Sequence, residues 1–281
     1  MAMNVEGKTA IVTGAGPGIN FCFARLPLSK GCNVVIADLA LRPEARALVS
    51  QYLTSSAAKA VFQETDNFAG ADIVCPGAGV YEPVNFWVPP RTFPSKDKLF
   101  KSRYSILDIN ITHPIRVTQM AIGHFLARKK PGVVVHVSSV ADQIPFFPTP
   151  MYVASKHALS GFVRSLSRLE NPPSHLLQIR VNAVAPARIL TPLWTDHPDK
   201  MQMVGKDNPG WIMPEDVAAV MLDLVQEEEH VGGTIIEVGE RVRKVEAFND
   251  PGPGVGGNEV QRDDSIEADM WASMERQYNG I

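Results

Sequence analysis

The feature of this chain that most restricts its fold is a glycine-rich turn between a short strand and a helical pattern. The expected strand, residues 9–13, is rich in β-branched side chains, and Gly14, Gly16 and Gly18 follow it. Glycine adopts backbone angles that other residues resist, and it lets the chain approach a ligand closely. The N-terminus of the next helix offers unpaired N–H groups to a pyrophosphate. Because a second strand follows at 33–38, we favour a nucleotide-binding turn over a ligand-free tight turn.

The rest of the chain alternates apolar runs with helical patterns, which predicts βαβ units and a parallel sheet. The run 133–137 is continuously apolar, as in strands that are covered on both faces. One doubly wound α/β domain is expected over residues 1–246. A flexible acidic tail is expected over 247–281, with a short amphipathic helix at 266–278 as the alternative. Strands are expected at 9–13, 33–37, 60–64, 71–75, 132–138, 178–184 and 233–238, and helices at 17–29, 42–54, 105–129, 151–170 and 214–228.

The composition is that of an ordinary globular protein. The 281 residues are 45% hydrophobic and 20% charged, enough for one large core, and the net charge is −3 without a basic tract. No apolar run approaches the ~18–20 residues of a membrane helix, and the first residues do not resemble a signal peptide. Three cysteines without metal-ligand spacing fit a reducing compartment. We therefore expect a cytoplasmic protein that binds no metal, no membrane and no nucleic acid.

A tyrosine and a lysine four residues apart suggest acid–base chemistry. Tyr152 and Lys156 share one face of an expected helix, and Ser139 stands thirteen residues upstream of Tyr152, at the end of an apolar run. A phenol normally titrates near pH ~10, and a cation held close lowers its pKa, which makes the tyrosine a usable base. An isolated pair of this kind often occurs by chance on a surface helix. The glycine-rich turn upstream argues against coincidence.

Together these residues resemble the short-chain dehydrogenase/reductase family over most of residues 5–245. Of the family's Thr-Gly-x-x-x-Gly-x-Gly pattern, Thr13, Gly14 and Gly18 match, and Asn20 replaces the last glycine. The finer pattern resembles the 15-hydroxyprostaglandin-dehydrogenase-like branch of fungal proteins. The resemblance implies a Rossmann-like doubly wound sheet with the strand order 3-2-1-4-5-6-7.

The resemblance also implies a set of catalytic residues. The family's active-site Asn, Ser, Tyr and Lys match Asn110, Ser139, Tyr152 and Lys156. Tyr152 would take the proton of a substrate hydroxyl while hydride leaves for the cofactor, and Ser139 would hold the substrate oxygen. Lys156 would lower the pKa of Tyr152 and bind the nicotinamide ribose. Asn110 would hold a water that relays protons to Lys156. The implied reaction interconverts a secondary alcohol and a ketone.

The implied cofactor is NAD. Asp38 ends the second strand, about twenty residues after the glycine turn, where an acid accepts the adenosine ribose hydroxyls and repels the extra phosphate of NADP. A residue that merely ends a strand is the alternative for Asp38. Asp66 resembles the family residue beside the adenine ring, and Ala78-Gly79 is what remains of the family's Asn-Asn-Ala-Gly segment. The cofactor-binding residues implied are Thr13, Gly14, Gly16, Gly18, Ile19, Asp38, Asp66, Ala78, Gly79, Tyr152, Lys156, Pro186, Ile189 and Thr191.

Two segments beside the expected site suggest an apolar substrate. Residues 81–104 follow the fourth strand at the carboxyl end of the sheet, where ligands bind in such folds. Their aromatic side chains, Phe86, Trp87 and Phe93, could wall a pocket or only anchor the segment to the core. Residues 193–213 take the place of the family's substrate lid, although their apolar residues are also ordinary packing residues. These apolar residues are Trp194, Met201, Met203 and Trp211.

A helix expected between the third and fourth strands is missing. Only residues 67–71 separate Asp66 from Asp72, whereas a parallel crossover normally needs a dozen or more residues. In the implied order the two strand ends lie about 22 Å apart, and six Cα steps reach about 20–22 Å. We therefore expect the third strand to be shortened, displaced or unpaired at its C-terminal end. Fast amide exchange over 60–66 and a partly uncovered sheet face would follow.

Three functions compete. The complete Asn-Ser-Tyr-Lys set favours a working NAD-dependent alcohol dehydrogenase that acts on a small alcohol or ketone. The missing helix, Asn20 and Pro27 favour a degenerate relative that binds cofactor weakly, because Pro27 costs ~3 kcal/mol inside a helix unless the helix ends nearby. A non-catalytic protein that binds a partner through the uncovered sheet face is the third. We favour the enzyme. The resemblance implies a homodimer or homotetramer through the helices at 105–129 and 151–170.

Overall fold

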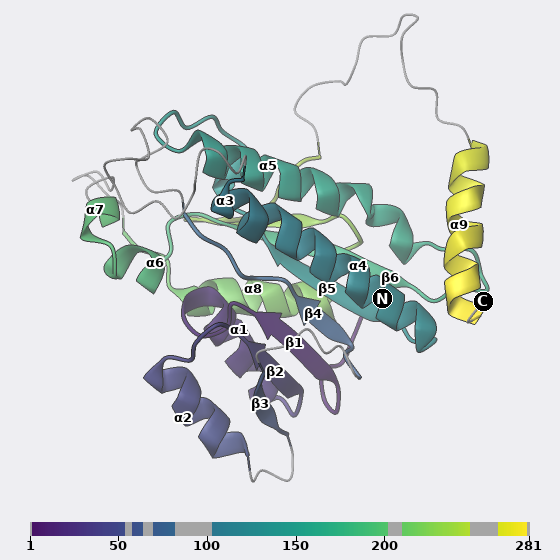
Figure 1. Cartoon of the computed structure of the whole chain (residues 1–281), viewed down its shortest axis with the longest axis horizontal. Coiled ribbons are helices and arrows are strands. Elements are labelled where there is room, and N and C mark those ends of the chain that lie inside the picture. The colour runs from purple at the N-terminus through teal and green to yellow at the C-terminus, as the bar shows by residue number, and fades with distance from the viewer. Residues whose placement is uncertain are drawn as a thin grey trace, which may run out of the picture.

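One sheet with helices on both faces organises the chain (Figure 1). The computed structural model describes residues 2–53, 58–63, 70–81, 103–201, 210–247 and 264–279. The strands within these ranges are β1 (Thr9–Thr13), β2 (Asn33–Ala37), β3 (Ala60–Gln63), β4 (Ile73–Cys75), β5 (Gly132–Val137), β6 (Ile179–Pro186), β7 (Ile235–Val238) and β8 (Val242–Lys244). Their order is β3-β2-β1-β4-β5-β6-β7-β8, and only the pair β7–β8 is antiparallel. The predicted doubly wound α/β fold is confirmed.

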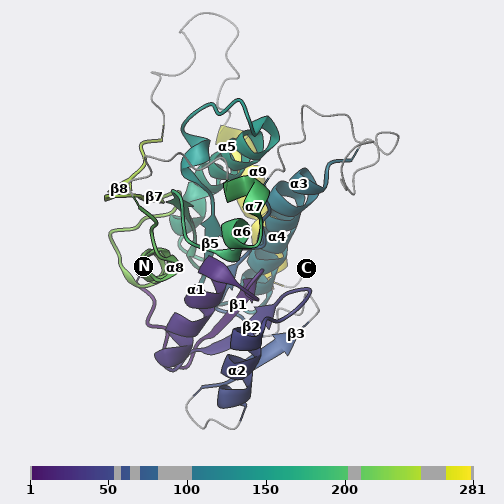
Figure 2. The same ribbon diagram turned by 90° about the vertical axis from the view of Figure 1, so that its left-hand side faces the viewer.

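Helices connect the strands and cover the sheet. The longer helices are α1 (Gly18–Ser29), α2 (Pro43–Tyr52), α4 (His113–Ala127), α5 (Pro150–Ser165), α8 (Pro214–Gln226) and α9 (Asp264–Asn279). The short helical segments are α3 (Ser105–Leu107), the π-helical η3 (Asp108–Thr112), the 3-10 turns η4 (Val140–Asp142) and η5 (Ser167–Glu170), α6 (Pro192–Thr195) and α7 (Pro198–Met201). Figures 1 and 2 show α1 and α8 together on one face of the sheet, with α4 and α5 on the other.

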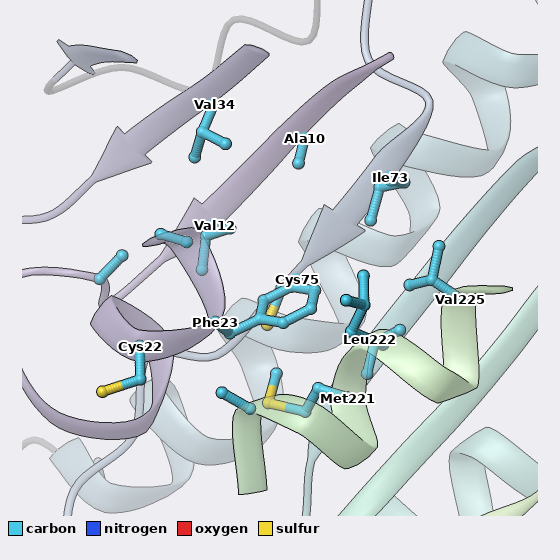
Figure 3. Close-up of a cluster of buried hydrophobic side chains, with 14 of the residues drawn as sticks. Ala10, Val12, Cys22, Phe23, Val34, Ile73, Cys75, Met221, Leu222 and Val225 are labelled. Atoms are coloured by element: carbon cyan, nitrogen blue, oxygen red, sulfur yellow. The ribbon is translucent and has the colours of Figure 1, made fainter. Parts of the chain in front are cut away.

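Each face of the sheet buries its own hydrophobic cluster. In Figure 3, Phe23 of α1 and the α8 residues Met221 and Leu222 meet Val12 of β1 and Ile73 of β4. The opposite face packs apolar residues of α4 and α5 against β4, β5 and β6. Full burial of one such side chain stabilises the fold by ~1.5–3 kcal/mol. The carboxyl ends of the parallel strands are therefore held by a rigid frame.

Most predicted elements are present with shifted ends. The strand predicted at 178–184 continues to Pro186, and every residue of β6 is buried between β5 and β7. The helix predicted at 105–129 is divided into α3, the π-helical turn η3 and α4. β8 was not predicted, because three exposed residues at a sheet edge leave no periodic pattern in the sequence.

Of the three alternatives expected for the third strand, the structure shows the shortened strand. β3 has only four residues, yet all of them pair in register with Val34 to Ala37 of β2. Because β3 already ends at Gln63 and β4 starts at Ile73, ten Cα steps separate the strands. Ten steps reach about 33–36 Å, which exceeds the separation of about 22 Å. Fast amide exchange is therefore no longer expected at 60–63, and residues 64–66 lie outside the described ranges.

The edge formed by β3 is exposed and apolar. Val61 is 45% exposed and Phe62 is 36% exposed. Val61 pairs with Val35, which packs toward the cluster beneath α4 and α5, so its side chain lies on the face that the missing helix would cover. The exposure of Val61 agrees with the predicted uncovering of this sheet face.

Pro27 is compatible with α1 because the helix ends directly after it. α1 stops at Ser29, two residues beyond the proline. The carbonyl oxygen of Pro27 accepts hydrogen bonds from the backbone N–H of Lys30 at 2.9 Å and of Cys32 at 3.1 Å. The proline thus helps to end the helix and does not break its middle.

The C-terminal segment contains the helix that was the alternative for this region. α9 lies at the ends of α4 and α5 that point away from α6 and α7 (Figure 1). Trp271, Met274 and Tyr278 pack against the cluster beneath α4 and α5, and Lys129 Nζ lies 5.1 Å from the centroid of the Tyr278 ring. The division of the chain into a catalytic domain ending at 246 and a tail stays a prediction.

Candidate functional site

A large cavity opens at the carboxyl ends of the parallel strands. Its volume is ≈ 1010 Å³, at the upper end of the range of about 300–1,000 Å³ for small-molecule sites. It lies where the strand order reverses between β1 and β4, the place where ligands bind in doubly wound sheets. The predicted residues that line it are Thr13, Gly14, Gly18, Ile19, Asp38, Ala78, Gly79, Ser139, Tyr152, Lys156, Pro186, Ile189 and Thr191.

Three predicted residues do not line this cavity. Gly16 is absent from its lining, and its backbone N–H donates a hydrogen bond to Asp38 Oδ2. Asn110 is 1% exposed and lies beneath the chain that follows β4. Asp66 lies outside the described ranges, so its expected place beside an adenine ring stays a prediction.

The glycine-rich turn forms a cradle that only a residue without Cβ permits. Gly14 has a φ of 68°, in the left-handed region. A Cβ on Gly14 would lie 2.6 Å from the Cα of Ala78, which is backbone and cannot move away. The Gly14 N–H bonds to Ala37 O at 2.8 Å, so the end of β1 is fixed against β2. The turn therefore fits a pyrophosphate held against the N-terminus of α1.

Asp38 lies at the end of β2 and faces the same cradle. Its Oδ2 accepts a hydrogen bond from the Gly16 N–H at 2.7 Å, and its Oδ1 accepts one from the Ala40 N–H at 3.3 Å. The carboxylate thus has a fixed position on the cavity wall, where it can accept ribose hydroxyls. The nearby cation Arg42 is ion-paired with Asp196, just after α6. This pair connects the loop after β2 to the segment that follows Thr191.

Asn20 is adapted to the turn although it departs from the family's glycine. Its Nδ2 donates to Gly77 O at 2.7 Å and to Gly14 O at 3.4 Å, which ties the turn to the chain after β4. A Cβ at position 77 would lie only 2.4 Å from Asn20 Oδ1. The Asn20 side chain therefore occupies space that is open because residue 77 is a glycine. The two departures from the family pattern compensate each other.

The catalytic residues predicted from the sequence converge on one wall of the cavity. Tyr152 and Lys156 project from α5, and Ser139 stands directly after β5, where its Oγ accepts a hydrogen bond from the Ala141 N–H at 3.2 Å. The hydroxyls of Ser139 and Tyr152 are hydrogen-bonded. Lys156 Nζ donates to Val137 O at 2.8 Å and lies 5.5 Å from the centroid of the Tyr152 ring.

The electrostatics of this wall differ from the simple expectation that Lys156 lowers the pKa of Tyr152. Burial raises the pKa of the Tyr152 phenol to about 12, although the hydrogen bond with Ser139 lowers it. Burial also lowers the pKa of the Lys156 ammonium to about 8, while the Asp142 carboxylate raises it. The desolvation of both groups outweighs their neighbours, because an enclosed site disfavours charge.

Asn110 holds the chain beside Lys156. Its Oδ1 accepts from the Val80 N–H at 2.9 Å, and its Nδ2 donates to Val80 O at 2.9 Å and to Ser155 Oγ at 3.2 Å. The π-helical turn η3 carries Asn110, and a π-helical turn is a frequent feature of functional sites. A Cβ on Gly79 would lie within 4.0 Å of both Asn110 Oδ1 and Lys156 Nζ. The water relay through Asn110 stays a prediction.

An aromatic wall extends from Tyr152. The ring centroids of Tyr81 and Tyr152 are 4.7 Å apart, and those of Tyr81 and Trp194 are 5.2 Å apart. Trp211 follows at 6.0 Å from Trp194, and the Arg188 guanidinium carbon lies 5.8 Å from the Trp211 ring centroid. Of the residues predicted to suggest an apolar substrate, Trp194 lines the cavity, whereas Met201 is absent from its lining. Phe86, Trp87, Phe93 and Met203 lie outside the described ranges.

The sequence did not predict two residues beside the candidate catalytic wall, Tyr81 and Asp142. Tyr81 lies against Tyr152 but follows Ala78-Gly79 without any motif of its own. Asp142 is a buried acid three residues after Ser139. A carboxylate this close to a serine that ends a buried strand is the signal that could have indicated it.

Metal-ligand groups and candidate membrane-spanning helices are both absent from the described residues. They contain no group of three or more His, Cys, Asp or Glu side chains that could hold a metal ion. None of the helices in this part of the chain is both long and apolar enough to cross a membrane. The three cysteines, Cys22, Cys32 and Cys75, are buried and unpaired.

A family model described as short chain dehydrogenase matches residues 8–202, which is more than half of the chain. The chain is 29% identical over 256 residues to 3beta-hydroxysteroid dehydrogenase 1 of Eggerthella lenta, covering 84% of this chain and 93% of the relative. It is 24% identical over 268 residues to the NAD(+) 15-hydroxyprostaglandin dehydrogenase of Mus musculus, covering 84% and 91%.

A solved structure supports the same fold. It is that of a 2-deoxy-d-gluconate 3-dehydrogenase candidate from Agrobacterium tumefaciens with bound NADP, 22% identical with a TM-score of 0.64. The match covers 84% of this chain and 96% of that chain. The two cofactor names found among these proteins are thus NAD(+) and NADP.

Proposed function

Because the chain belongs to the short-chain dehydrogenase family, we propose that it is an oxidoreductase that transfers hydride between NAD and a secondary alcohol or ketone. The observation that carries this proposal is the position of Ser139, Tyr152 and Lys156 on one wall of the cavity that the glycine-rich turn also lines. Proton-transfer groups and a nucleotide cradle in one enclosure are what such a reaction requires.

Each residue of the wall has a role in this chemistry. The Tyr152 phenolate takes the proton of the substrate alcohol, and in the reverse direction the Tyr152 phenol donates its proton to the ketone oxygen. Ser139 holds the Tyr152 hydroxyl by a hydrogen bond and stabilises charge that develops on the substrate oxygen. Lys156 is fixed by Val137 O, and its ammonium favours the ionised phenol. A nicotinamide cofactor, when bound, supplies the acceptor or donor of hydride.

The residues near the turn support NAD over NADP. Asp38 Oδ2 is fixed by the Gly16 N–H, so this carboxylate would accept the ribose hydroxyls of a bound NAD and would repel the 2′-phosphate of NADP. The residues that directly follow, Leu39 to Leu41, carry no cation that could neutralise such a phosphate. Arg42 is engaged by Asp196.

The aromatic wall supports a substrate with an apolar body. The Tyr81 ring lies between those of Tyr152 and Trp194, with centroid distances of 4.7 Å to Tyr152 and 5.2 Å to Trp194. Ile144 and Phe146 line the same cavity and are 53% and 41% exposed. A ligand that covers these side chains would gain about 25 cal/mol for each Å² of apolar surface removed from water.

The proposal is tested by two measurements on the same preparation. Initial rates of NAD reduction with a panel of apolar secondary alcohols should exceed those without alcohol. A fluorescence titration with NADH should saturate, and NADH at a hundred times its Kd should add about 2.7 kcal/mol to the free energy of unfolding. Saturable NADH binding without turnover of any alcohol would favour the degenerate relative. The absence of both would favour a non-catalytic partner-binding protein, for which the exposed Val61 is the supporting observation.

Asp38→Ala should lower the preference for NAD over NADP at least about tenfold in kcat/KM, because a hydrogen bond to a charged group contributes about 1.5–3 kcal/mol. The phosphate repulsion disappears with the same change. Asp223→Ala, at an exposed position of α8, is the matched control and should leave the ratio unchanged. A parent enzyme that prefers NADP, or a ratio insensitive to Asp38, would show that the role of this residue is wrong.

Assembly and location remain part of the proposal. Self-association into a homodimer or homotetramer through α4 and α5 is expected from the family. α9 already packs against α4, which reduces the surface that this contact could use. The cytoplasmic location rests on the three unpaired cysteines.

A further inference from the structure

A buried carboxylate stands beside the catalytic residues without a role in the chemistry above. Asp142 ends the short turn η4 and is 8% exposed. Its Oδ2 accepts hydrogen bonds from Ser138 Oγ at 3.3 Å and from Ser160 Oγ. The two serine hydroxyl oxygens are themselves 2.7 Å apart. These three side chains, the Asp142 cluster, join the end of β5, the turn η4 and the middle of α5.

The Asp142 cluster connects the two elements that carry the catalytic wall. The Ser138 hydroxyl lies 3.4 Å from the carbonyl oxygen of Lys156, so the cluster reaches the backbone of the catalytic lysine. The turn that ends at Asp142 begins on Ser139, whose Oγ accepts from the Ala141 N–H at 3.2 Å. A shift of Asp142 relative to α5 would therefore change the separation of Ser139 from the catalytic residues of α5.

On balance the surroundings raise the pKa of Asp142, and its polar neighbours oppose this rise. Burial raises the pKa of Asp142, but the hydrogen bonds from Ser160 and Ser138 lower it. Arg164 and His157 of α5 also lower it. Two hydroxyl donors on one oxygen suit a charged acceptor better than a neutral acid.

The charged groups on the opposite side of η4 are already paired. Gln143, the residue after Asp142, donates to Glu237 Oε2 at 3.2 Å and accepts from Arg243 at 2.8 Å. Glu237 of β7 and Arg243 of β8 form an ion pair with each other. Their opposite charges largely cancel. Asp142, three residues after Ser139, is therefore the nearest uncompensated charge along the chain.

We propose that Asp142 is a positioning residue for the reaction, which holds the Ser139 turn against α5 and places a fixed negative charge beside Lys156 and Tyr152. The proposal rests on the proposed dehydrogenase function. A negative charge at this place favours the protonated form of both neighbours, so it raises the pKa of Lys156 and of Tyr152. For Lys156, the rise in pKa caused by Asp142 opposes the fall caused by burial, which helps the ammonium to stay protonated near neutral pH.

Asp142→Asn removes the charge and keeps an oxygen that can accept the serine hydroxyls. Loss of a negative charge lowers the pKa of both neighbours. Both limbs of the pH profile of kcat for alcohol oxidation should therefore move to lower pH, by about half a unit or more. Asp223→Asn makes the same change in net charge on the exposed side of α8 and should move neither limb. A profile for Asp142→Asn that superimposes on the parent's would overturn the charge role, as would an equal shift in the control.

Ser160→Ala separates positioning from charge. It deletes the Ser160 hydroxyl, which contacts both Asp142 Oδ2 and Ser138 Oγ, and leaves the carboxylate in place, so kcat should fall several-fold while both limbs stay where the parent has them. An unchanged kcat would overturn the positioning role. This variant also tests the proposal if Asp142→Asn does not fold, because alanine is well tolerated within a helix.

A readout without turnover separates failure of this proposal from failure of the proposed function. Only the neutral amine of Lys156 undergoes reductive methylation by formaldehyde and borohydride, and mass spectrometry measures its rate. At a pH of about 7, Lys156 should react faster in Asp142→Asn than in the parent, because its pKa is lower. Faster methylation in a protein that oxidises no alcohol would support the role of Asp142 and refute the dehydrogenase. Equal methylation rates in an active enzyme would refute the role of Asp142 alone.

Discussion

Replacement of Tyr152 by phenylalanine is expected to lower kcat/KM for alcohol oxidation by about 10²–10⁴-fold, the usual contribution of a positioned acid or base. The change removes only the hydroxyl that exchanges a proton with the substrate oxygen. The ring, its contact with Tyr81 and the position of Lys156 do not depend on that hydroxyl. NADH should therefore bind the variant with a Kd within about twofold of the parent value, measured by fluorescence titration.

Tyr104→Phe is the matched control for this experiment. Tyr104 is 48% exposed and does not line the cavity, so loss of its hydroxyl should change neither kcat/KM nor NADH binding. Equal rates for Tyr152→Phe and the parent would refute the mechanism. A large loss of NADH affinity in Tyr152→Phe would instead indicate that the hydroxyl organises the cofactor site.

Gly14→Ala should weaken cofactor binding at least about tenfold and destabilise the fold. The left-handed backbone at a φ of 68° costs alanine ~1–2 kcal/mol. The new Cβ would also meet the Ala78 backbone, since the ideal position lies 2.6 Å from its Cα. Overpacking of this kind costs ~1–3 kcal/mol. Thermal unfolding should show a Tm about 5 °C or more below that of the parent.

Gly161→Ala tests whether these losses come from the turn or from any glycine replacement. Gly161 lies within α5, and a Cβ there would meet nothing within 4 Å. Alanine in a helix interior is ~0.5–1 kcal/mol better than glycine, so this control should leave Tm unchanged or raise it. A Gly14→Ala protein with normal Tm and normal NADH affinity would show that the turn is not the nucleotide cradle.

The parts of the fold that could be predicted from sequence are those with strong local signals. The apolar run 133–137 and the turn at Gly14 each carry their own chemistry, and both lie where expected. The position of β3 could not be derived from chain length, because that estimate assumed a strand reaching Asp66, whereas pairing with β2 ends at Gln63. Where a short strand ends is decided by its partner, and a distance estimate is sensitive to a few residues.

The candidate site shows the same division. Tyr152 and Lys156 are four residues apart on one helix, so the sequence alone brings them together. The pKa values could not be predicted in this way, because burial dominates both, and burial depends on the whole enclosure. The Asp142–Ser160 contact joins segments eighteen residues apart across two elements, which no local spacing indicates.

The contact between Asn20 and Gly77 has a consequence for how this lineage can change. An asparagine on α1 and a glycine after β4 occupy one shared volume, with 2.7 Å from Asn20 Nδ2 to Gly77 O. A step back toward the common family residue at position 77 alone would force two side chains into the same space. A step back at position 20 alone would leave two carbonyl oxygens without their donor. The two sites therefore form an epistatic pair, and neither intermediate offers an easy evolutionary route back to the common pattern.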